Sequence, residues 1–131
     1  MIIKNYLILE DGFIDSFSKL MLKKMPAKQC LEVSACLEEL ISHHTILVRT
    51  RRAIADKFCK KNESGIPLRD DRDNLVFDSE EDRKKCYEEL KEIHEEEIDI
   101  PLTNKIKIYE DELCTPREIL LLKDIIDIVE R

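Results

Sequence analysis

The sequence predicts a single, mainly helical domain with a small β element, an α+β arrangement spanning residues 1–131. The length suits one domain, and 43% hydrophobic residues suffice for a core of that size. With only two glycines and four prolines, tight turns are few and long helices are favoured. Apolar residues also recur at helical spacing along most of the chain.

The amino-terminal residues are expected to form a short strand and a short helix. Residues 2–9 are apolar and β-prone, which favours a strand, and Asp11-Gly12 marks a turn. Residues 13–24 show helical apolar spacing, which predicts a short amphipathic helix. Pro26 ends that run and suits the first turn of the next helix.

The longest periodic segment covers residues 27–61 and predicts a helix of about 35 residues, roughly 50 Å long. Two series repeat every seven residues: one is Cys30, Leu37, His44, Arg51 and Phe58, and the other is Val33, Leu40, Leu47 and Ile54. Ile41, Val48 and Ala55 widen the same stripe. Such a stripe needs a partner from this chain or from another copy. Gly65 is expected to cap the helix in the left-handed conformation.

A second helix is predicted for residues 80–97. Before it, residues 66–77 suggest a loose hairpin with a charged tip. Ser79 is a suitable cap, with Asp82 three residues on in the manner of a capping box. One face of this helix is apolar, and the other is dense with glutamates between Glu88 and Glu97.

The carboxy-terminal part predicts short strands and a final helix. Residues 98–100 and 105–109 alternate with period two, as strands do. Thr115 should cap a helix that begins at Pro116, with Glu118 reaching back to the cap. The apolar residues through Val129 cover most of this helix's circumference. We therefore expect burial on more than one side and self-association into a homo-oligomer.

The net charge and the cysteines indicate which partners and which cellular compartment to expect. A formal net charge of -7 argues against general nucleic-acid binding. The five cysteines include no CxxC pair, which argues against a zinc site or a disulfide framework and predicts reduced thiols. No signal peptide or membrane-spanning run is recognisable, so a cytoplasmic location without membrane attachment is expected.

One cluster on the long helix is a candidate ligand-binding site: His44, Arg49, Arg51 and Arg52, beside His43. Guanidinium groups can clamp a phosphate or carboxylate in bidentate fashion, and packing of two copies would double the cluster. A small anionic ligand could then sit at the subunit junction. The simpler interpretation, which the sequence favours, is that Arg51 buries its stem at the stripe edge and pairs with a glutamate.

Other candidates have simpler explanations. Adjacent His43 and His44 point to different helix faces, and His94 with Glu97 forms only half of a metal site. The acidic run could mimic DNA or bind a basic protein, but such runs are more often solvated helix faces. Cys59 lies near lysines but has no recognisable catalytic partner. The sequence therefore predicts no catalytic residue, no metal and no cofactor.

The order of features from about residue 25 onward resembles small accessory proteins of tailed bacteriophages and prophages. A long helix closes with Arg51 and Phe58, followed by a KKNESG turn, a hairpin ending in LVF, an acidic YEEL helix, an EIDIPL segment and a capped helix. The resemblance carries no catalytic residues. It implies a phage protein in the cytoplasm of a host bacterial cell.

The leading functional hypothesis is a non-enzymatic phage-type accessory protein that acts as an oligomeric binding module for a host or phage protein. One alternative is a protein that sequesters an anionic nucleotide-type immune signal at a subunit interface. Another is a virion assembly component.

Overall fold

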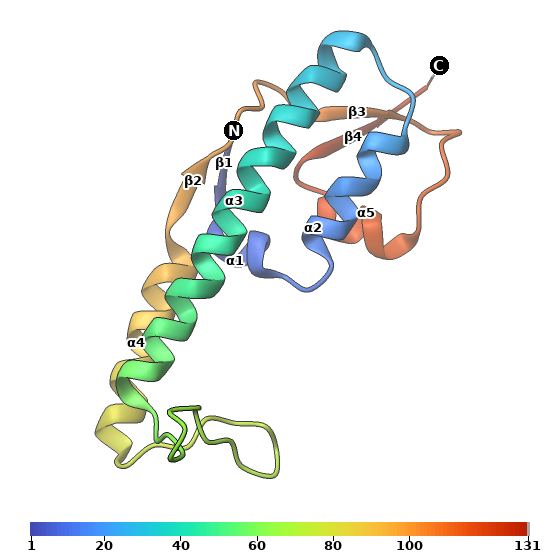
Figure 1. Ribbon diagram of the computed structural model, residues 1–131. Coiled ribbons are helices and arrows are strands. Elements are labelled where there is room, and N and C mark those ends of the chain that lie inside the picture. The colour runs from blue at the N-terminus through green and yellow to red at the C-terminus, as the bar shows by residue number, and fades with distance from the viewer. Residues whose placement is uncertain (131) are drawn as a thin grey trace.

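The computed structural model describes residues 1–130 and has two regions, which we call the body and the limb (Figure 1). The limb, residues 48–95, comprises the last third of α3 (Ala27–Phe58), a connecting segment of residues 59–79, and α4 (Glu80–Glu95). The remaining residues form the body. Its elements are β1 (Ile2–Lys4), α1 (Asn5–Leu9), α2 (Phe13–Ser18), the 3-10 helix η1 (Lys19–Leu22), the first two-thirds of α3, β2 (Glu97–Asp99), β3 (Ile106–Tyr109), α5 (Pro116–Leu122) and β4 (Ile126–Val129).

The fold class predicted from the sequence is confirmed: the chain is mainly helical with two small two-stranded sheets. The long helix runs for 32 residues, and its heptad series Val33, Leu40, Leu47 and Ile54 is buried throughout. A spacing of seven keeps these side chains on one helix face. That face packs first on the body and then on α4, so the partner of the stripe lies within the same chain.

The hydrophobic core lies almost wholly in the body. Phe13, Phe17 and Ile8 are fully enclosed, and they join the first two-thirds of α3 and the strands β3 and β4 in one cluster. The two phenylalanine rings lie 6.2 Å apart between centroids, at a tilt of 43°. Leu47 marks the outer end of this cluster on α3, so the limb extends beyond the core.

Two predicted elements were wrong. Residues 2–9 do not form one strand, because only Ile2–Lys4 pairs, in antiparallel fashion with β2, and the chain then turns into α1. The final helix does not run through Val129: α5 ends at Leu122, and residues 126–129 form a strand that pairs in parallel with β3. The β-branched residues of this run favour a strand where a partner is present. The stretch from β3 to β4, with α5 in it, supplies the crossover that a parallel pair needs.

The side chains predicted to cap the starts of α4 and α5 are confirmed. Ser79 Oγ accepts a hydrogen bond from the Asp82 amide at 3.1 Å, and Thr115 Oγ1 accepts one from the Glu118 amide at 3.2 Å. Glu118 does not reach back to the cap as expected. Its carboxylate is buried and forms an ion pair with Lys19 at 3.5 Å, which links α5 to η1.

Gly65 does not cap the long helix, contrary to the sequence prediction. The helix ends at Phe58, and Gly65, with φ of +79°, lies in a separate turn. Asn62 organises that turn, because its Oδ1 accepts hydrogen bonds from the amides of Ser64 and Ile66. The connecting segment then continues as three short extended stretches joined by isolated bridges, among them the predicted hairpin pairing Arg69↔Leu75.

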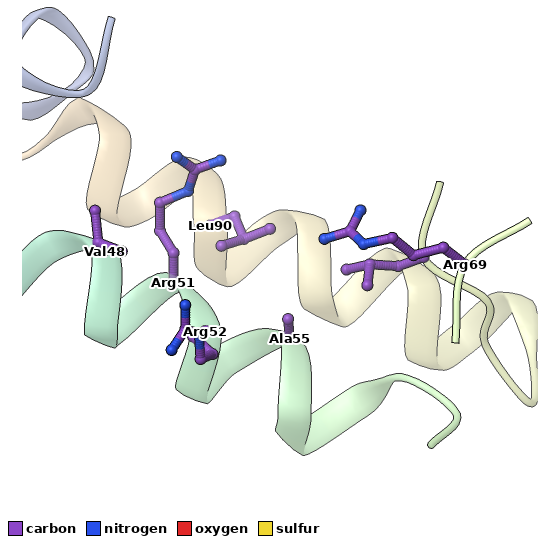
Figure 2. A pocket seen from close by; sticks show the side chains of 7 residues that line it. Val48, Arg51, Arg52, Ala55, Arg69 and Leu90 are labelled. Atoms are coloured by element: carbon purple, nitrogen blue, oxygen red, sulfur yellow. The ribbon is translucent and has the colours of Figure 1, made fainter. Parts of the chain in front are cut away.

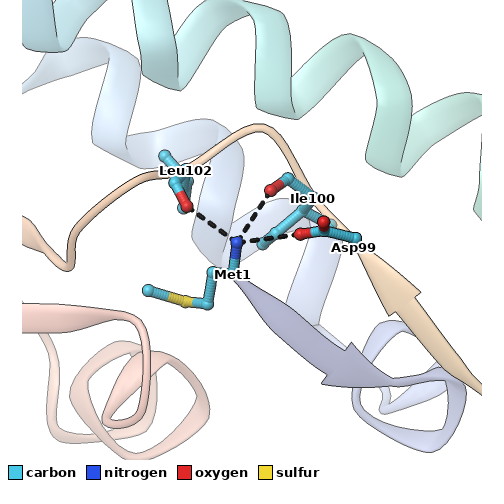
Figure 3. A network of polar contacts seen from close by, with 4 residues as sticks. All are labelled: Met1, Asp99, Ile100 and Leu102. Atoms are coloured by element: carbon cyan, nitrogen blue, oxygen red, sulfur yellow. Dashed lines mark hydrogen bonds and ion pairs between the residues drawn. The ribbon is translucent and has the colours of Figure 1, made fainter.

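The amino terminus holds the segment around and after β2 within the body (Figure 3). The Met1 ammonium donates to Asp99 Oδ1 at 3.0 Å, to the Ile100 carbonyl at 3.1 Å and to the Leu102 carbonyl at 2.8 Å. At the other end of β1, the buried Asn5 side chain connects the body to the limb, because it donates to the carbonyl of Ile93 at the end of α4. These bonds fix the segment that follows α4 against the body. Among the residues described, no helix is both long and apolar enough to cross a bilayer.

Candidate functional site

The candidate site is a groove of about 200 Å³ along one flank of the limb (Figure 2). It is bounded by α3, α4 and the connecting segment. Three arginines line it, Arg51, Arg52 and Arg69, and we call it the arginine groove. The other lining residues are apolar: Val48, Ala55, Leu75 and Leu90. The groove therefore combines positive charge with an apolar floor.

Each arginine reaches the groove from a different backbone position. Arg51 and Arg52 are consecutive on α3, so their side chains leave the helix about 100° apart. Arg69 comes from the connecting segment, where its Nη1 donates to the Asp73 carbonyl at 2.8 Å. Asp73 has φ of +64°, a tight-turn conformation that brings its carbonyl back toward Arg69. Figure 2 shows Arg51 and Arg69 on opposite sides of Leu90.

The positive charge of the groove is poorly balanced. Within residues 1–130, neither Arg51 nor Arg52 forms an ion pair, and the groove lining contains no carboxylate. Arg69 has one acidic neighbour, Asp73 Oδ1, at 3.8 Å from its Nε, and this carboxylate is 88% exposed. The pairing of Arg51 with a glutamate, which the sequence favoured, is therefore not among the ion pairs of the described chain. Unneutralised guanidinium groups on an apolar floor suit an anionic ligand.

The structure divides the cluster that the sequence proposed. Arg51 and Arg52 line the groove, whereas Arg49 is exposed on another side of α3 and His44 is half-buried outside the lining. Sequence reasoning missed Arg69. The charged hairpin tip was the available signal, but nothing local indicates that the segment folds back over α3.

His94, near the end of α4, interacts electrostatically with Arg51 of the groove. Burial lowers its pKa below the usual value of 6.5, and the positive charge of Arg51 lowers that pKa further. Its Nε2 is buried without a hydrogen-bond partner. The neutral imidazole is therefore favoured near pH 7, and the charge of Arg51 couples its titration to the groove.

The candidate metal ligands do not converge. His43 is held in the body, where its Nε2 donates to Asn5 Oδ1 at 2.9 Å. No group of three or more metal-ligating side chains occurs in the described part of the chain. All five cysteines are free thiols, and burial, followed by the charge of Glu39, raises the pKa of Cys36 to about 12.

A second hollow, of about 490 Å³, shares Leu75 with the arginine groove and is more polar. The rings of Phe77 and Tyr87 lie 6.0 Å apart beside it, and Arg83 stacks on Tyr87 at 5.7 Å. Arg83 thus already occupies the position over the Tyr87 ring that an external cation could take. The arginine groove remains the stronger candidate because two of its three arginines, Arg51 and Arg52, form no ion pair within residues 1–130.

Comparisons with protein-family models, curated proteins and solved structures found no match to this chain. The candidate site therefore depends on its own geometry and charge.

Proposed function

We propose that this protein is a non-enzymatic binding module that recognises an anionic ligand through the arginine groove. The observation that carries the proposal is the set of three guanidinium groups around an apolar floor, in a chain of net charge -7. Arginine and apolar side chains supply binding energy and charge recognition. They supply neither a nucleophile nor a general base, so the lining favours binding over catalysis.

The biological setting of this proposal comes from the resemblance to small phage accessory proteins. In that setting the protein acts in the cytoplasm of the host bacterial cell on a host or phage protein.

Self-association belongs to the same proposal. Exposed apolar side chains near the carboxy-terminal end of the body, including Leu113, Leu120 and Ile128, support it.

The unbalanced arginines also favour a second candidate function, the sequestration of an anionic nucleotide-type immune signal. Phosphate groups bind guanidinium in the same bidentate fashion as carboxylates. In that version the ligand is a small molecule, and a subunit junction beside the groove completes the site. A role in virion assembly remains a third proposal, to which no feature of the groove adds support.

The test compares two anionic probes, tripolyphosphate and a short polyglutamate peptide, by isothermal titration calorimetry at low and high salt. We expect at least one to bind, more weakly as salt rises. The triple variant R51A/R52A/R69A should lose at least about tenfold in affinity, because each charged contact is worth about 1.5–3 kcal/mol.

The matched control is Arg49→Ala, which removes one positive charge from the same helix outside the groove. It should bind both probes nearly as tightly as the parent. The proposal is wrong if neither probe binds, or if R49A weakens binding as much as the triple variant does.

A further inference from the structure

We infer that the arginine groove receives an amphipathic helix of a partner protein, one with an apolar stripe flanked by Asp or Glu residues. This inference rests on the proposed function and narrows it to one kind of ligand. In the complex, α3, α4 and the partner helix would form a three-helix bundle along the limb.

The first argument is a second apolar line on α3. Ile41, Val48 and Ala55 are separated by seven residues each, so they share one flank of the helix. The buried series ending in Ile54 packs inside the chain. Ile41 is 47% exposed, and Val48 and Ala55 are only half-buried. A heptad line without a covering element is the seam that a further helix fills.

The second argument is the shape of the floor. Leu90 of α4 and Leu75 of the connecting segment lie beside Val48 and Ala55, so the apolar surface sits between two antiparallel helices. Side chains of a third helix interdigitate well with such a furrow. The limb also has little core of its own, since its buried hydrophobic residues are Ile54, Cys59 and Cys86, and of these only Cys86 is fully enclosed. A third helix would add the missing apolar burial.

The third argument is the placement of charge. Arg51 and Arg69 lie on opposite sides of Leu90, so their guanidinium groups do not converge on one point (Figure 2). A single phosphate would prefer convergent donors. Two separated arginines beside an apolar floor instead match carboxylates that flank an apolar stripe.

The occupant is better sought in another protein than in a second copy of this chain. A two-fold interface centred on the arginine groove would place the same surface on both sides. Because residues near the symmetry axis face their own copies, Arg51 and Arg52 would then lie close to those of the other copy, where like charges repel. An acidic helix from a different protein has complementary charge instead.

The test selects binders from a displayed library of single helices with random residues on one face, using the full-length protein as bait. We expect the enriched helices to carry an apolar stripe with Asp or Glu beside it. Their affinity, measured with synthetic peptides by fluorescence anisotropy, should drop at least tenfold in Val48→Asp and in Arg51→Glu. Arg49→Ala is the matched control and should leave affinity unchanged.

A charge exchange separates recognition from a general loss of structure. The best peptide, resynthesised with Lys in place of the acidic residue opposite Arg51, should bind R51E better than it binds the parent. Because Val48→Asp can disturb packing, Ile41→Ser at an exposed position gives a second apolar variant, with circular dichroism as the check on folding.

The inference is overturned if the enriched helices are not acidic, or if the apolar variants bind them as the parent does. It is also overturned if the free protein dimerises through this flank, seen as a dimer that Val48→Asp converts to a monomer. Binding of tripolyphosphate or polyglutamate without binding of any helix would reject this inference and keep the proposed function. Failure of every probe would reject both.

Discussion

The body and the limb differ in how they use their side chains. The body encloses Phe13, Phe17 and Ile8 completely, and its core joins eight helices and strands from both ends of the sequence. The limb is a helix pair with few enclosed side chains and many charges, and it holds the arginine groove. The difference teaches that the hydrophobic core and the arginine groove lie in separate regions: the body holds most of the buried core, and the limb presents a surface that is incompletely buried by its own chain. If the proposed function is correct, stability and recognition are divided in the same way.

The largest expected effect is the loss of a body core side chain. Phe17→Ala should lower the free energy of unfolding by about 3–5 kcal/mol, because it leaves a cavity in the core. Ile54→Ala, the matched change in the limb, should cost nearer 2 kcal/mol, at the low end of the range for Ile→Ala. Guanidinium unfolding curves measure both. Equal losses would show that the limb is packed as firmly as the body. Leu113→Ala, at a residue 87% exposed, should change stability by less than about 0.5 kcal/mol.

The next effect concerns the amino-terminal network of the body, which holds the segment that follows α4. Acetylation of the Met1 amine in this chain removes its charge and most of its donors to Asp99 and to two backbone carbonyls. We expect a loss of about 1–3 kcal/mol, the range for leaving such acceptors unsatisfied. The measurement compares unfolding of acetylated and unmodified protein. Asp99→Asn is the control, with a smaller loss because Asp99 is 77% exposed. Unchanged stability after acetylation would mean that the network contributes nothing.

Buried thiols give a third comparison, because Cys36 lies in the body and Cys86 in the limb. Both are fully enclosed, so each reacts with a maleimide only when its surroundings open. The comparison is between the free energy of opening around Cys86 and that around Cys36. If the first is lower by at least about 1.4 kcal/mol, Cys86 should be labelled at least tenfold faster than Cys36. Mass spectrometry of the labelled peptides at successive times provides both rates, with exposed Cys30 as the fast reference. Equal rates for Cys36 and Cys86 would show that the two regions open as one unit.

The sequence predicts the two long helices, α3 and α4, better than it predicts the short elements of the body. Their caps and seven-residue spacings are local signals, and Ser79 and the Leu40–Leu47–Ile54 series appear in the structure as expected. The body depends on pairings between distant segments. The run before Val129 reads as a helix on its own, and it becomes β4 because β3 lies beside it.

The same reasoning explains which part of the candidate site was found. Arg51 and Arg52 stand out because they interrupt a periodic helix, and their places follow from that period. Arg69 enters the groove through the irregular fold of the connecting segment, which has no periodic signal. The uncovered line of Ile41, Val48 and Ala55 was visible as part of the stripe, but only the structure separates it from the buried line.

The smallest expected effect is a pH dependence of stability that comes from His94. Burial, followed by the charge of Arg51, lowers its pKa in the folded protein, whereas the unfolded chain takes up the proton near pH 6.5. Well above pH 6.5 neither state is protonated, and His94 adds no pH dependence. As the pH falls through 6.5, the unfolded state gains the proton first, so stability declines until the folded pKa is passed. His94→Gln should remove this part of the decline, measured by unfolding at a series of pH values.

The same histidine reports on the groove. Arg51→Gln removes one of the two causes of the lowered pKa, so the His94 pKa should rise, as followed by the imidazole proton shifts in NMR. An acidic ligand in the groove should raise it too, because its carboxylates offset the charge of Arg51. If Arg51→Gln raises the pKa but the acidic peptide leaves it unchanged, the peptide binds elsewhere on the protein. If both raise it, the ligand's negative charge lies beside Arg51, where the body and the limb meet.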